Sequence, residues 1–91
     1  MNSSAQSELV QHLVQLEDDL RNDRFDAARA QLGFLDADEL SPATLVGILT
    51  ITSFARVELG DARTRFFLRA EERLRRALGE ERAEELLRNR R

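Results

Sequence analysis

The sequence contains one long uncharged run, residues 40–55, in a chain of which 34% of the residues are charged. Ser41 followed by Pro42 is a strong helix start, because the hydroxyl accepts from a free backbone N–H and proline at the first helical position loses no hydrogen bond. At the helical period, one broad face of this segment contains Leu45, Ile48, Leu49, Ile51, Thr52, Ala55 and Leu59. We therefore expect a buried central helix that continues to Leu59.

The opposite side of the same helix also carries apolar and small residues. These are Val46, Thr50, Phe54 and Val57. A helix with two such sides needs a second neighbour, either another part of the chain or a partner. We expect these four residues to bind a protein partner or a second copy of the chain. The run is shorter than the roughly 20 apolar residues of a membrane span, so we expect no membrane span.

The other apolar periodicities predict an all-α fold in a single domain, residues 1–91. Helices at 4–22 and 24–35 would form a first antiparallel hairpin, an acidic linker at 36–40 would follow, and 41–78 would form a second hairpin. A short last helix at about 80–88 would precede a frayed tail. The expected buried stripe of the fourth helix contains Phe67, Ala70, Leu74 and Leu78. The result is a compact bundle or a short α-solenoid.

Charge is distributed unevenly along the chain. Residues 1–55 hold nine acids and three arginines, whereas residues 56–91 hold eight acids and eleven arginines. We expect Glu17, Asp18 and Asp19 to form a solvated acidic run. We also expect Glu71 with Arg75, and Glu72 with Arg76, to pair at the favourable i, i+4 spacing.

One side of the fourth helix is rich in arginine. Arg65, Arg69, Arg73 and Arg76 lie within one arc. Such a face can bind phosphates or an acidic partner. Against nucleic acid stand the formal charge of −3 and the pI of about 5.2.

Apolar positions repeat at an offset of 35 residues, for example Val10 with Leu45 and Leu13 with Ile48. The run from Asp23 to Ala28, followed by Leu32 and Leu35, resembles the turn and second helix of a tetratricopeptide repeat. This resemblance implies two stacked helix hairpins, a TPR-like α-solenoid that binds a peptide or protein in a concave groove. It transfers no binding residue to this chain.

The residue types of common catalytic and metal sites are sparse. His12 is the only histidine, and the sequence lacks Cys, Tyr, Trp and Lys. We therefore expect no enzyme, no catalytic residue, no metal site and no cofactor. The absence of cysteine and of a recognisable signal peptide favours a cytoplasmic location. The sequence predicts a non-enzymatic protein–protein interaction module (adaptor, chaperone-like or regulatory), with a small nucleic-acid-binding regulator as the alternative.

Overall fold

The computed structural model describes the backbone of residues 3–91 and the side chains of residues 10–91. Over this part of the chain the fold consists only of helices. The α-helices are α1 (Ser3–Arg21), α2 (Phe25–Phe34), α3 (Pro42–Thr52), α4 (Arg56–Leu78) and α5 (Glu80–Leu87), and two short 3₁₀ turns are η1 (Ala37–Glu39) and η2 (Ser53–Ala55). The all-α prediction is confirmed.

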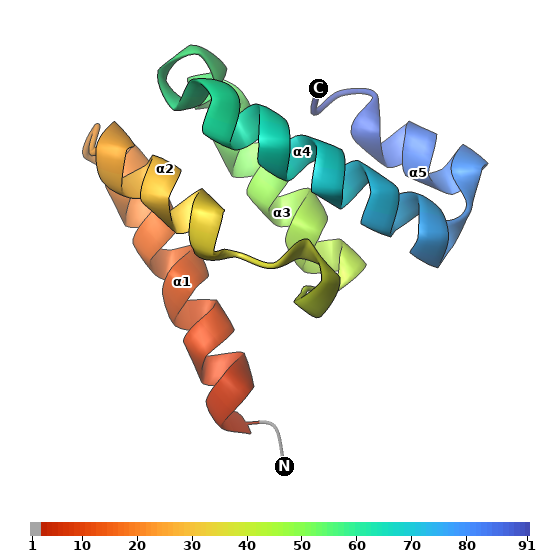
Figure 1. The fold of residues 1–91 in the computed structure, drawn as a ribbon, viewed down its shortest axis with the longest axis horizontal. Coiled ribbons are helices and arrows are strands. Elements are labelled where there is room, and N and C mark those ends of the chain that lie inside the picture. The colour runs from red at the N-terminus through yellow and green to blue at the C-terminus, as the bar shows by residue number, and fades with distance from the viewer. Residues whose placement is uncertain (1–2) are drawn as a thin grey trace.

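The helices pack into a flat globule with extents of 37 × 35 × 16 Å. Helix α4 crosses the whole molecule and contacts α2, α3, α5 and η1, while α1 packs mainly on α2 and more lightly on α3 (Figure 1). The uncharged helix α3 lies behind α4 in this view. The element around which the others gather is therefore α4, and the expectation that the 40–55 helix holds this place is wrong.

The predicted start of α3 is confirmed. Ser41 is the N-cap residue, its hydroxyl accepts from the backbone N–H of Thr44 at 3.2 Å, and Pro42 occupies the first helical position. Asp36 caps η1 in the same way by accepting from the Asp38 N–H. Each cap satisfies a backbone donor that a helix start leaves free.

The predicted end of this helix at Leu59 is wrong, because α3 ends at Thr52. Thr50, Thr52 and Ser53 each donate a hydroxyl hydrogen bond of 2.7 Å to a backbone carbonyl three or four residues earlier. Such bonds compete with the helical ladder and favour its termination. The chain turns through η2 and enters α4, where Gly60 has φ 51° and ψ −131°. Helical geometry is therefore interrupted at Gly60, inside α4.

The core forms along the predicted apolar rows. Leu16, Ala28, Leu32, Leu45, Ile48, Leu49, Leu59, Phe66, Ala70 and Leu74 are fully buried. Leu87 of α5 completes this core from the side of α4. Leu78 departs from the predicted stripe with 37% of its surface exposed, because it is the last residue of α4 before the turn at Gly79.

The segment Pro42–Leu78 contains an 18-residue window whose mean hydropathy is 1.3, so by length and composition it is apolar enough to cross a membrane. The segment is not one straight helix, since the backbone leaves helical geometry at Ala55 and again at Gly60. A window of this kind also occurs in core helices. The absence of a membrane span therefore stays a prediction.

Candidate functional site

Two large apolar side chains project from the connection between α3 and α4. Phe54 is the middle residue of η2, and Val57 is the second residue of α4. Their side chains are 88% and 90% exposed. Both residues were predicted to face a partner, and both lie on the surface of the fold. We call this pair the tip surface.

Val46 and Thr50 do not belong to the tip surface, although the sequence grouped them with it. Val46 is half-buried and packs against the core. The Thr50 hydroxyl accepts from Arg90 Nε at 2.8 Å. The C-terminal residues therefore contact this side of α3, and the predicted frayed tail is wrong at Arg90 because its side chain and carbonyl both bind the fold.

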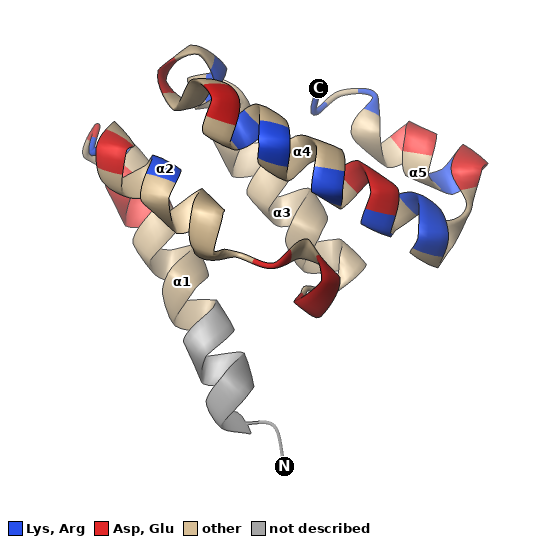
Figure 2. Ribbon diagram, viewed as in Figure 1, with Lys and Arg blue, Asp and Glu red and all other residues tan. Residues whose placement is uncertain are grey.

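The arginines predicted as an anion-binding face belong to α4, which carries several basic segments in Figure 2. Their surroundings differ. Arg65 and Arg69 are exposed, and Arg73 is half-buried. Among the described residues these three form no ion pair. Arg76 instead pairs with Asp38 of η1 at 2.9 Å.

The Arg76–Asp38 contact also corrects the predicted Glu72–Arg76 pair. The two side chains come from opposite halves of the chain. Arg76 and Asp38 therefore attract each other between the two halves of the chain, as the uneven distribution of charge indicates. Both side chains are exposed, so its contribution to stability is small.

Arg63 is buried, with only 5% of its surface exposed, and the sequence did not single it out as functional. Its Nε donates to the Thr52 hydroxyl at 3.0 Å, and its Nη2 donates to the carbonyls of Leu49 at 3.0 Å and Arg90 at 2.5 Å. Burial, followed by the charge of nearby Arg56, lowers the pKa of Arg63. The guanidinium thus connects the end of α3, the start of α4 and the C-terminal residues.

The position of Arg63 in the sequence indicates that its side chain is buried. Arg63 precedes Phe67, Ala70 and Leu74 at steps of four, three and four residues, so it continues the buried stripe of α4. An arginine on such a stripe must bury its guanidinium against acceptors or extend it to water. The guanidinium also lies 5.6 Å from the centre of the Phe67 ring.

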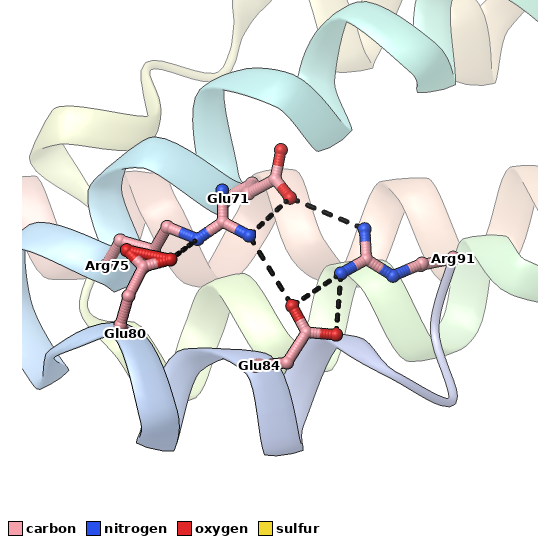
Figure 3. A network of polar contacts seen from close by, with 5 residues as sticks. All are labelled: Glu71, Arg75, Glu80, Glu84 and Arg91. Carbon is pink, nitrogen blue, oxygen red and sulfur yellow. Dashed lines mark hydrogen bonds and ion pairs between the residues drawn. The ribbon is translucent and has the colours of Figure 1, made fainter.

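A network of ion pairs joins α4 to α5 (Figure 3). The predicted Glu71–Arg75 pair is present at 3.2 Å, and Arg75 also lies 2.9 Å from Glu80 and 3.4 Å from Glu84. The Arg75 Nε is buried without a hydrogen bond, so its contact with Glu80 is an ion pair in poor hydrogen-bond alignment. Arg91 donates to both carboxylate oxygens of Glu84 at 2.7 and 2.8 Å and to Glu71 at 3.4 Å.

This network perturbs the acid that lies between its two arginines. The hydrogen bond from Arg91, together with the charges of Arg91 and Arg75, lowers the pKa of Glu84. The same hydrogen bond raises the pKa of Arg91. These contacts hold the C-terminal residue against α4 and α5.

The acidic run of α1 is only partly solvated. Glu17 and Asp18 are exposed, but Asp19 is buried with 2% of its surface exposed. Its carboxylate accepts from Gln15 Nε2 and from Arg24 Nε, each at 2.9 Å. The hydrogen bond with Asp19 raises the pKa of Arg24. Asp19 therefore fastens the α1–α2 turn.

The remaining polar groups of the described chain show no cluster of three His, Cys, Asp or Glu side chains that could hold a metal ion. His12 is half-buried on α1, where its Nδ1 contacts the side-chain amide of Gln31 on α2. That contact packs two helices together. The candidate functional features of the described chain are therefore the tip surface, the arginine-rich side of α4 and the surroundings of Arg63.

Comparison of the chain with protein-family models, with curated proteins and with solved structures yields no significant match in any of the three.

Proposed function

We propose that this chain is a non-enzymatic protein–protein interaction module of the cytoplasm that self-associates through the tip surface. The observation that supports this proposal most is the exposure of Phe54 and Val57, at 88% and 90%. The other large apolar side chains of residues 40–59 are buried or half-buried. Covering a phenylalanine at an interface contributes about 1.5–3 kcal/mol to the free energy of association.

We further propose that α1–α2 and α3–α4 act as two antiparallel, TPR-like hairpins. The 35-residue offset of apolar positions supports this arrangement, as do the reversals of chain direction between α1 and α2 and between α3 and α4 in Figure 1. An adaptor, chaperone-like or regulatory role would use the same exposed apolar residues.

The substitution Phe54→Asp tests the proposal. Placing a charge at the contact should weaken self-association by about tenfold or more, since 1.4 kcal/mol corresponds to a factor of ten. Helicity measured by circular dichroism should stay near that of the unmodified chain, because Phe54 makes little contact with the core. Association is measured by sedimentation equilibrium.

Phe34→Asp is a matched control. Phe34 is the last residue of α2 and is 80% exposed, but it lies outside the tip surface. The control should associate like the unmodified chain. Equal loss of association in both variants would show that any added charge has this effect and would contradict the assignment of the tip surface.

A nucleic-acid-binding regulator is the second candidate, supported by Arg65, Arg69 and Arg73, which form no ion pair among the described residues. Such binding would weaken steeply with salt, because it releases counterions from the phosphates. Reversing the charges of Arg65 and Arg69, neither of which forms an ion pair with a described residue, should lower the affinity. The absence of a gel shift at low salt would rule this function out.

A further inference from the structure

A hollow of about 240 Å³ lies beside Arg63, at the junction of the two parts of α4. Three arginines line it: Arg56, Arg63 and Arg91. Gly60, Thr64 and Phe67 also line it, and none of the described residues in its wall is acidic. The hollow is therefore positive in charge and open on one side.

Arg63, which borders the hollow, has donors without an acceptor among the described residues. Its Nε and Nη2 are directed to Thr52, Leu49 and Arg90. Its Nη1 carries two further N–H groups, for which the described residues provide no acceptor. Nη1 is not among the fully buried polar atoms without a partner, so it retains access to solvent.

The charges around the hollow are unequally compensated. Arg91 is bound by Glu84 and Glu71. Among the described residues Arg63 contacts neutral oxygens and the face of the Phe67 ring but no carboxylate, and Arg56 forms no ion pair. A buried guanidinium without a counter-ion is costly, and an anion seated beside it would offset that cost. Two positive charges remain to be matched.

We propose that this hollow binds a phosphate group, either inorganic phosphate or the phosphate of a small phosphomonoester. A phosphate carries about −1.5 to −2 charges near neutral pH, which matches Arg63 and Arg56 together better than a single carboxylate does. Arginine donors in a fixed fork suit phosphate oxygens. Leu68 borders the same hollow and is 57% exposed, so an ester with an apolar group gains a surface to contact.

The direct test is a titration with inorganic phosphate at constant ionic strength, followed through the backbone amide signals by NMR. The amides of Gly60 and Thr64 should shift and saturate, while that of Gly33, which lies on α2, should not move. Acetate should bind more weakly. Phosphate and acetate shifting the same signals equally, or phosphate shifting none of them, would overturn the proposal.

Phenyl phosphate distinguishes the source of the phosphate. Tighter binding than inorganic phosphate assigns the hollow to an ester that contacts Leu68, and equal binding assigns it to the free ion. The titration is repeated in a Phe54→Ala variant, which removes the large apolar side chain of the tip surface without adding a charge two residues from Arg56, and phosphate binding should be unchanged. The phosphate proposal can then fail or succeed independently of self-association.

A pair of arginine variants completes the test. Arg56→Gln removes an exposed charge of the hollow and should weaken phosphate binding by about two- to fivefold. Arg65→Gln removes an exposed arginine outside the hollow and should leave the affinity unchanged. Equal weakening in the two variants would indicate a general charge effect and would overturn the site.

Discussion

Arg63 illustrates how one side chain can organise a junction without a counter-charge. Its guanidinium donates to the Thr52 hydroxyl and to two backbone carbonyls, which lie in α3 and in the C-terminal residues. Hydrogen bonds to a charged group contribute more than neutral ones, and removing a single acceptor leaves a buried donor unsatisfied. Thr52 is fully buried, so water cannot replace its hydroxyl at that point.

Thr52→Val keeps the shape of the side chain and removes that acceptor. We expect the free energy of unfolding to fall by about 1–3 kcal/mol, because Arg63 Nε loses its partner in a buried site. Thr64→Val is the control, since Thr64 is exposed and its hydroxyl makes only a 3.4 Å bond to the Gly60 carbonyl. Urea unfolding measures both, and equal effects would contradict the role given to Thr52.

The connection between α3 and α4 shows what local sequence can and cannot predict about an element. Ser41 and Pro42 predict the start of α3 correctly, because capping is a local interaction. The hydroxyl groups of Thr50, Thr52 and Ser53 donate hydrogen bonds to backbone carbonyls near the end of α3 and favour its termination. The spacing of apolar residues carries no information about these bonds. The tip surface results from this early end.

Two glycines in this region should respond to alanine with opposite signs. At Gly60, φ is 51°, a conformation that L side chains rarely adopt, so Gly60→Ala should cost about 1–3 kcal/mol of stability. Gly47 lies within α3, and an added Cβ there meets no atom within 4 Å. Gly47→Ala should therefore stabilise by about 0.5–1 kcal/mol.

Thermal or urea unfolding compares these two variants with the unmodified chain. Stabilisation by Gly60→Ala would show that the backbone at this position is not held in the left-handed region. Destabilisation by Gly47→Ala would show that the exposed side of α3 is covered by another group.

On the scale of the whole molecule, the all-α class and the buried rows were predictable because helical periodicity is a property of each segment alone. The central place of α4 was not, because it depends on contacts between distant segments. Arg76 with Asp38 and Arg63 with the Arg90 carbonyl join residues 38 and 27 positions apart. The same holds for the candidate site: Phe54 and Val57 were named from the sequence, whereas the hollow beside Arg63 requires the fold.

Sedimentation equilibrium of the unmodified chain over a series of concentrations measures self-association through the tip surface. We expect an average mass that rises above the 10.4 kDa of one chain as concentration increases. A mass that stays at 10.4 kDa over the whole series would contradict it.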